Sequence, residues 1–208
     1  LDMYGVILKD SGDGFYSYVN RTFPQLTPAG IYPDWDKADV GEISSLEVFR
    51  RLGFQGNLAQ IERNYLDTVE INETFYGFAE EIKKCHKLAL ISNDSSEWSR
   101  YFREKFHLNN YFDVISISGD LKMKKPDPRI FQLTLEKLGC PPEECVYIDD
   151  RRYNLEAAQA LGMDTVEGEE GIVHEDRRTD IISNRNWFYL HQFRNVIMTQ
   201  HKSEAKRS

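Results

Sequence analysis

Polar residues follow four short apolar runs of this 208-residue chain. The residues at these places are Asp2, Ser92, Lys125, Asp149 and Asp150. If the apolar runs are parallel strands, their carboxyl ends meet at one edge of a sheet, where such folds bind ligands. We therefore expect two or three carboxylates, a hydroxyl and an ammonium to share one crevice.

Such a set of groups can cleave a phosphate ester. Clustered carboxylates repel one another, and Mg²⁺ relieves that repulsion while it contacts the substrate phosphate. A carboxylate can attack phosphorus to form an aspartyl-phosphate, which water then hydrolyses. The Lys125 ammonium would neutralise charge, and the Ser92 hydroxyl would hold phosphoryl oxygens. The residues therefore predict hydrolysis of a phosphate ester with Mg²⁺ as the cofactor.

Two further acidic residues near these strand ends have a simpler explanation. Asp94 and Glu97 have the spacing of a capping box, and Asp127 precedes a proline, Pro128, that suits the first position of a helix. We interpret Asp94 and Asp127 as helix caps, and they are not included in the predicted site.

The elements that must position the site alternate between strands and helices. Periodicity predicts strands at residues 88–92, 114–118, 145–148 and 163–166. It predicts helices at residues 96–106, 128–138 and 155–161. Strands separated by helices imply a doubly wound parallel sheet with helices on both faces, that is, a Rossmann-like α/β core.

Residues 9–75 have a helical pattern with little strand character. Ser44 with Glu47, and Asn57 with Gln60, have capping-box spacing before apolar residues. We predict that 9–75 is an inserted helical cap domain and that 1–8 and 76–208 form the α/β core. An amphipathic stretch at residues 187–197 is expected to pack on the outer face of the sheet.

The composition excludes several classes of protein. The chain has 26 Lys and Arg against 34 Asp and Glu, a formal net charge of −8, which argues against non-specific nucleic-acid binding. Its apolar runs are far shorter than the roughly 18 residues of a membrane helix. The three cysteines lack zinc-site spacing. We expect a soluble, cytoplasmic protein with reduced thiols that acts on a small molecule, without nucleic-acid or membrane partners. The sequence carries no signal for an oligomeric state.

The strand-end segments resemble, in this order, the four motifs of the haloacid dehalogenase superfamily. The matching segments are Asp2-Met-Tyr4-Gly-Val6, Ser92-Asn93, Lys125-Pro-Asp-Pro-x-Ile-Phe131 and Ile148-Asp-Asp-x-x-x-Asn154. The predicted cap, with Gly41-Glu-Ile-Ser44, resembles the helical cap of the first subclass of this superfamily.

The resemblance implies a role for each matching residue. Asp2 would be the nucleophile. The implied catalytic residues are Asp2, Tyr4, Ser92 and Lys125. The implied substrate-binding residues are Ser92, Asn93, Lys125 and Asn154. The implied Mg²⁺ ligands are Asp2, Asp149 and Asp150.

Tyr4 departs from the pattern of the superfamily's phosphatases. These enzymes usually have a second Asp at this place, which protonates the leaving group and then activates water. The 2-haloacid dehalogenases have Tyr there, and a halide leaves without a proton. Those dehalogenases, however, work without metal and lack a pair like Asp149-Asp150, which is costly without a cation.

We therefore predict an Mg²⁺-dependent phosphatase of a small phosphorylated metabolite. A metal-independent 2-haloacid dehalogenase, acting on a halogenated acid, is one alternative. A non-catalytic relative that binds a phosphorylated ligand is the other.

The position of Asp2 leads to one more expectation. A nucleophile at the end of a central strand needs about five residues of strand before it. Only Leu1 precedes Asp2. We expect residues upstream of Leu1 to complete this strand. The alternative is a sheet without its middle strand, with Asp2 on a mobile terminus where catalysis would be doubtful.

Overall fold

Short parallel strands position the candidate site. The computed structural model describes residues 1–10 and 13–168. Strand β1 (Ala89–Ser92) pairs in parallel with β2 (Val114–Ile117), and β3 (Val146–Asp149) pairs in parallel with β4 (Asp164–Glu167). The predicted parallel pairing is confirmed.

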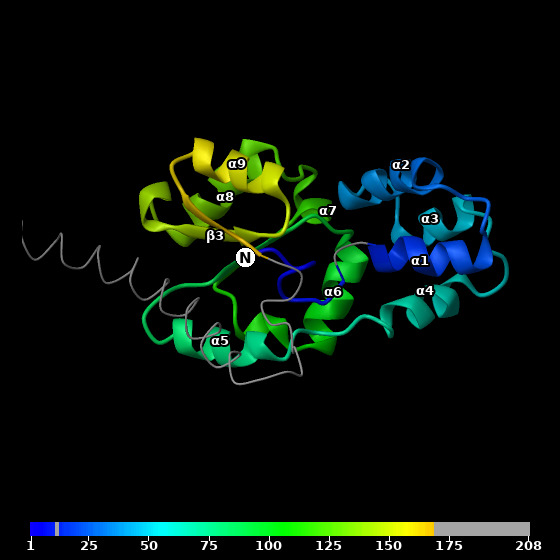
Figure 1. The fold of residues 1–208 in the computed structure, drawn as a ribbon, viewed down its shortest axis with the longest axis horizontal. Helices are drawn as coiled ribbons and strands as arrows, with labels where there is room; N and C mark the ends of the chain where they lie inside the picture. Colours follow the sequence, from blue (N-terminus) through cyan, green and yellow to red (C-terminus); the bar gives the residue numbers. More distant parts are fainter. Residues whose placement is uncertain (11–12, 169–208) are drawn as a thin grey trace, which may run out of the picture. The chain divides into compact units, whose positions relative to one another are not determined.

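The first two residues of the chain lie between these strand pairs. The amino group of Leu1 donates to the carbonyl oxygen of Ala89 at 2.8 Å, and the Ile91 N–H donates to the Leu1 carbonyl oxygen at 2.9 Å. On the other side, the Asp2 N–H donates to the Ile148 carbonyl oxygen at 2.9 Å. Leu1 and Asp2 therefore connect β1 to β3. Figure 1 marks the N-terminus beside β3.

Helices cover both faces of the strands, as predicted (Figure 1). On one face lie α8 (Pro128–Leu138) and α9 (Arg152–Ala160), and on the other lie α5 (Thr74–Ile82) and α6 (Ser96–Lys105). The remaining short elements of the core are α7 (Ser118–Leu121) and the 3₁₀ helices η1 (Leu108–Asn110) and η2 (Pro142–Glu144).

An apolar core joins α8 and α9 to the strands. Its buried side chains are Ile91, Ile130, Phe131, Leu135, Tyr147, Leu155, Ala158 and Met163. The Phe131 ring meets the Tyr147 ring edge-on, with 5.1 Å between the centroids. This packing fixes β3, whose carboxyl end holds Asp149.

Two predictions about helix starts are wrong. The helix expected at 155–161 begins three residues earlier, at Arg152, because the Arg151 N–H donates to the Asp149 carboxylate at 2.8 Å and so opens the first turn. Asp94 does not cap α6. Ser95 is the N-cap, and its hydroxyl oxygen accepts from the Trp98 N–H at 3.3 Å.

The Asp127 cap is confirmed. Its carboxylate accepts from the Arg129 N–H at 2.9 Å, and Pro128 opens α8.

The segment predicted to be the cap contains four helices in the described residues. These are α1 (Asp13–Thr22), α2 (Pro28–Asp39), α3 (Ser45–Arg51) and α4 (Leu58–Leu66). Ser44 caps α3 by accepting from the Glu47 N–H, and Asn57 caps α4 by accepting from the Gln60 N–H, both at 3.2 Å. The predicted N-caps are thus confirmed.

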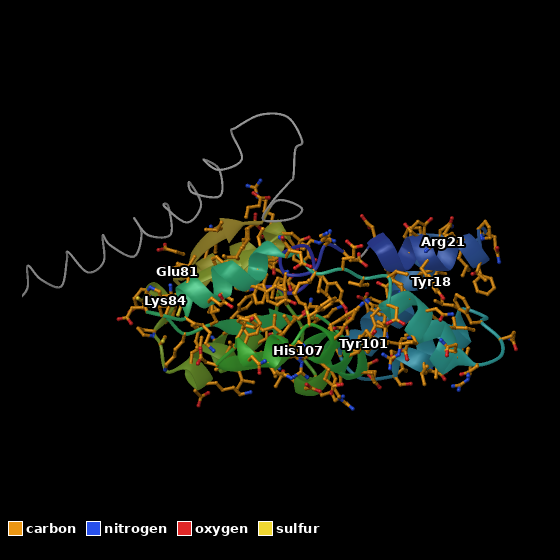
Figure 2. The ribbon with its side chains drawn as sticks, turned by 90° about the horizontal axis from the view of Figure 1, so that it is seen from below. Tyr18, Arg21, Glu81, Lys84, Tyr101 and His107 are labelled. Atoms are coloured by element: carbon orange, nitrogen blue, oxygen red, sulfur yellow. The ribbon has the colours of Figure 1, made fainter. Side chains whose placement is uncertain are left out.

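Aromatic side chains hold these four helices together and join them to α6. The Phe15 ring lies 4.5 Å from the Trp35 ring and 5.3 Å from the Trp98 ring, between centroids. The hydroxyl of Tyr18, on α1, donates to the backbone oxygen of Ile61 on α4 at 2.9 Å (Figure 2). Because Trp98 belongs to α6, the core of the cap helices continues into the α/β part.

The chain enters and leaves the cap helices at neighbouring positions. The Lys9 N–H donates to the Glu70 carbonyl oxygen at 3.0 Å, and the Asn72 N–H donates to the Ile7 carbonyl oxygen at 2.8 Å. Helix α5 begins at Thr74, so a boundary at residue 75 falls inside it. The division into 9–75 and the surrounding core stays a prediction.

Three further predictions concern the C-terminal stretch, membrane-spanning helices and the cysteines. The packing of residues 187–197 lies outside the described residues. Among the described helices, none is both long enough and apolar enough to cross a membrane. The three cysteines of the chain are described and are free thiols.

Candidate active site

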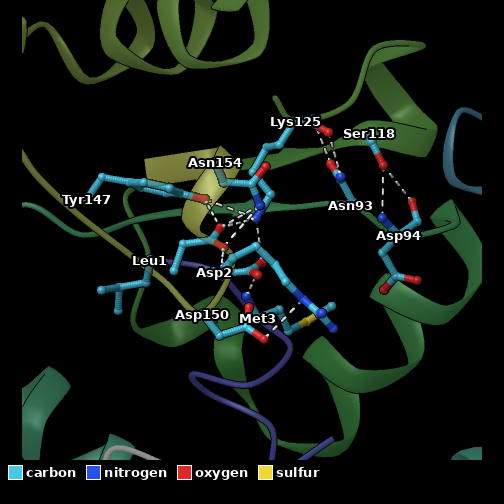
Figure 3. Close-up of polar contacts among 12 residues, drawn as sticks. Leu1, Asp2, Met3, Asn93, Asp94, Ser118, Lys125, Tyr147, Asp150 and Asn154 are labelled. Carbon is cyan, nitrogen blue, oxygen red and sulfur yellow. Dashed lines mark hydrogen bonds and ion pairs between the residues drawn. The ribbon is translucent and has the colours of Figure 1, made fainter. Parts of the chain in front are cut away.

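Lys125 lies at the centre of the candidate site (Figure 3). Its Nζ is 2.7 Å from Asp2 Oδ1, 2.8 Å from Asp149 Oδ2 and 3.0 Å from the Tyr147 hydroxyl. The Lys125 side chain is only 1% exposed. An ammonium has three donors, and these three contacts use them. Residues 2, 125 and 149, predicted to meet at the strand ends, are therefore brought together.

Asn93 holds the backbone of Lys125 in place. Its side-chain amide donates to the Lys125 carbonyl oxygen at 2.9 Å and accepts from the Lys125 N–H at 2.8 Å. This double contact ties the end of β1 to the loop before α8. A contact between Asn93 and a substrate stays a prediction.

Asp149 is the most heavily bonded carboxylate of the site. Asn154 Nδ2 reaches both of its oxygens, at 3.0 and 3.1 Å, and the Tyr147 hydroxyl approaches Oδ2 at 2.5 Å. Burial acts to raise the pKa of Asp149, but Lys125 and the hydrogen bonds outweigh it and hold the pKa below its usual value. Asp149 is thus a fixed anion that positions Lys125, and substrate binding by Asn154 stays a prediction.

Three carboxylates of the site could hold a metal ion. One oxygen from each of Asp2, Asp149 and Asp150 lies within 4.8 Å of the other two. Mg²⁺ takes oxygen ligands at 2.0–2.1 Å, so two opposed ligands stand about 4.2 Å apart. The three carboxylate oxygens would bind this ion after moving slightly closer together.

Electrostatics also favours a cation at these carboxylates. Burial raises the pKa of Asp2, to about 7, although Lys125 opposes the shift. Burial likewise raises the pKa of Asp150. Buried carboxylates that face one another resist ionisation, and a divalent cation removes that penalty.

Gly5 allows the loop after Asp2 to approach Asp150. Its φ angle is +71°, a conformation that side chains disfavour. A Cβ atom at this position would lie 2.7 Å from the Asp150 carboxyl carbon. Glycine is therefore required here both by the backbone conformation and by the neighbouring carboxylate.

Several polar groups at the site are buried without a hydrogen-bond partner. They are the Ser92 hydroxyl, the Tyr4 hydroxyl and both carboxyl oxygens of Asp94. A buried polar group that lacks a partner costs about 1–3 kcal/mol. Ser92 ends β1, so a polar ligand bound at the strand ends would supply the hydrogen bond that its hydroxyl lacks.

Sequence reasoning missed two residues of this site. Tyr147 contacts both Lys125 and Asp149, and the two-residue period of a strand places it on the same face as Asp149. Asp94 was predicted as a cap, although Ser95, the next residue, offers a hydroxyl three residues before Trp98. The two-residue period that places Tyr147 and the spacing of Ser95 and Trp98 can both be read from the sequence.

The family model for haloacid dehalogenase-like hydrolases matches residues 1–167. The chain therefore belongs to the haloacid dehalogenase-like hydrolases, as the motifs at the strand ends predicted.

Relatives in this family include both phosphatases and a dehalogenase. The chain is 35% identical to phosphoglycolate phosphatase of Aquifex aeolicus over 172 residues, which cover 79% of this chain and 80% of that protein. It is 34% identical over 88 residues to the phosphorylated carbohydrates phosphatase of Thermotoga maritima, covering 42% of this chain and 39% of that protein. It is 32% identical over 79 residues to (S)-2-haloacid dehalogenase 4A of Burkholderia cepacia, covering 38% of this chain and 34% of that protein. The last two matches thus span little more than a third of those relatives.

Solved structures confirm the fold. A haloacid dehalogenase family enzyme from Bacteroides thetaiotaomicron, in complex with magnesium and inorganic phosphate, superimposes with a TM-score of 0.69 at 22% identity. The match covers 85% of this chain and 95% of that one.

Proposed function

We propose that this protein is an Mg²⁺-dependent phosphatase of small phosphorylated metabolites. One observation supports this most strongly: the carboxylates of Asp2, Asp149 and Asp150 converge beside a buried lysine. The hydroxyl of Ser92, at the end of β1, is also buried without a partner. The phosphatases among the relatives lend further support.

Each residue of the site has a role in this reaction. An oxygen of Asp2 attacks phosphorus, and the aspartyl-phosphate is then hydrolysed by water. Lys125 favours the ionised form of Asp2 and neutralises charge on the phosphoryl group, while the Ser92 hydroxyl donates to a phosphoryl oxygen. Bound at Asp2 and Asp150, with Asp149 adjacent, Mg²⁺ would stabilise the negative charge of the phosphoryl oxygens.

Tyr4 favours a second candidate, a 2-haloacid dehalogenase, because that chemistry needs no acid at this position. The similarity to the Burkholderia cepacia dehalogenase points in the same direction. The three convergent carboxylates weigh against it, because a metal-free reaction gives no compensation for their repulsion.

Metal dependence distinguishes these candidates. We expect the protein with Mg²⁺ to release p-nitrophenol from p-nitrophenyl phosphate and to lose this activity in EDTA. Asp150→Asn should raise the Mg²⁺ concentration for half-maximal rate by at least about tenfold, since even an outer-shell partner of a metal contributes 10–100-fold.

Asp164→Asn is the matched control, because Asp164 is an exposed residue at the start of β4. Its Mg²⁺ dependence should equal that of the wild type. Phosphate release that EDTA leaves unchanged, or metal-independent halide release from a 2-chloro acid, would contradict the proposal.

A further inference from the structure

Asp94 is a buried carboxyl group that its own helix does not use. Its side chain is fully buried, and neither carboxyl oxygen has a hydrogen-bond partner. Its backbone, in contrast, is firmly held: the N–H donates to the Ser118 hydroxyl at 2.8 Å, and the Gly119 N–H donates to the Asp94 carbonyl oxygen at 3.1 Å (Figure 3). The structure thus fixes the position of Asp94, while its carboxyl oxygens have no hydrogen bond of good geometry.

The carboxyl group of Asp94 lies beside the hydroxyl of Tyr4. The two interact without completing a well-formed hydrogen bond, and the Tyr4 hydroxyl is itself buried without a partner. The Tyr4 ring is held edge-on against Phe102, with 6.1 Å between the centroids. Tyr4 stands two residues after the nucleophile Asp2, at the place where an acid is missing. Asp94 therefore presents a carboxyl group next to the position that lacks one.

The surroundings of Asp94 favour the protonated form of its carboxyl group. Burial, followed by the charge of Asp39, raises the pKa of Asp94 well above its usual value. The titratable groups that face Asp94 are Tyr4 and Asp2 on the N-terminal loop, Asp39 on α2 and Tyr65 on α4. All of these are acids. Asp39 in turn has Lys124 at 3.6 Å.

We propose that Asp94 is the acid–base catalyst of the phosphatase reaction and takes the role for which Tyr4 has no carboxyl group. This inference rests on the proposed function. The geometry that carries it is a fixed, fully buried carboxyl group with two unpartnered oxygens, placed beside the tyrosine that replaces the acid and two residues after Ser92.

The proton balance of the reaction is complete. In the first step, a bond forms between Asp2 Oδ and phosphorus while the bond from phosphorus to the ester oxygen breaks, and the Asp94 proton passes to that oxygen to give the alcohol. In the second step, the Asp94 carboxylate takes a proton from water, whose oxygen bonds to phosphorus as the Asp2–phosphorus bond breaks. Phosphate leaves, and both residues return to their starting states.

The variant Asp94→Asn, which preserves size and burial, tests this inference. An alkyl phosphate needs a protonated leaving group, whereas p-nitrophenolate leaves readily without a proton. We therefore expect the ratio of kcat/KM for an alkyl phosphate to that for p-nitrophenyl phosphate to fall by about 10²–10⁴-fold, the usual contribution of general acid catalysis. The second step loses its base, so p-nitrophenol should appear in a burst of one equivalent per enzyme. The substrate ratio does not depend on the fraction of the variant that folds, and the size of the burst measures that fraction.

Asp39→Asn is the matched control, because Asp39 is also a buried carboxyl group with an unpartnered oxygen. At a pH below the high-pH fall of kcat/KM, this variant should keep the wild-type substrate ratio. It should also move the high-pH fall of kcat/KM to lower pH, because removing the Asp39 charge lowers the pKa of Asp94.

Equal losses on both substrates without a burst would show that Asp94 is only structural and would overturn the inference while leaving the phosphatase proposal intact. Absence of phosphate release by the wild type from either ester would overturn both.

Discussion

Changing Asp2 to Asn should abolish phosphate release. The amide is a poor nucleophile and forms no aspartyl-phosphate, so we expect the rate with Mg²⁺ to fall on the order of 10⁴-fold or more, as it does when other hydrolases lose a member of the nucleophilic machinery. Lys125 keeps its contact with Asp149 at 2.8 Å, so the variant should stay folded. A phosphate-release assay on p-nitrophenyl phosphate measures the effect.

The control for Asp2→Asn is again Asp164→Asn, an exposed change of the same type. It should retain the wild-type rate. If Asp2→Asn remains within tenfold of the wild type while circular dichroism shows both proteins folded, Asp2 is not the nucleophile.

Lys125→Met should have the largest effect on stability. The substitution keeps the length of the side chain but leaves Asp2 and Asp149 buried without their cation, at contacts that now measure 2.7 and 2.8 Å. Removing one partner of a buried ion pair costs about 3–5 kcal/mol. We expect a loss of this size in the free energy of unfolding in urea, together with loss of phosphate release.

An exposed lysine provides a matched control. Lys9 is 54% exposed and pairs with Glu70 at 3.0 Å, a partner that is itself 71% exposed. Surface ion pairs contribute about 0–1 kcal/mol, so Lys9→Met should change the free energy of unfolding by no more than that. Equal losses for Lys9→Met and Lys125→Met would mean that the buried carboxylates do not depend on Lys125.

The convergence of Asp2, Lys125 and Asp149 could be predicted from the sequence, because each lies in a segment expected at the end of a strand and parallel strands end at one edge of a sheet. The same reasoning could not predict which residues the side chains of Asn93 and Asn154 contact. Asn93 braces the Lys125 backbone and Asn154 holds Asp149, and these partners depend on how two loops meet in space rather than on spacing along the chain.

Asp94 was wrongly predicted to cap α6 because two neighbouring residues have the spacing of an N-cap. Asp94 with Glu97 and Ser95 with Trp98 both suit the start of α6, and only the tertiary contacts of Asp94 with Ser118 decide between them. Tyr147 was missed for a different reason. A tyrosine in an apolar run indicates a buried strand, and its hydroxyl acquires a role only once Lys125 is placed beside it.

Backbone hydrogen bonds position Asp2 between two strands. Leu1 bonds to Ala89 in β1, and Asp2 bonds to Ile148 in β3. That residues upstream of Leu1 complete a strand stays a prediction.

Mass spectrometry of the peptide that contains Asp2 tests the central claim most directly. The protein is mixed with Mg²⁺ and p-nitrophenyl phosphate and quenched in acid during turnover. We predict that this peptide gains the mass of one phosphoryl group, and that the gain disappears in EDTA and in Asp2→Asn. Phosphate release with an unmodified Asp2 peptide, or an ester formed on Asp2 from a 2-haloacid without metal, would contradict the account.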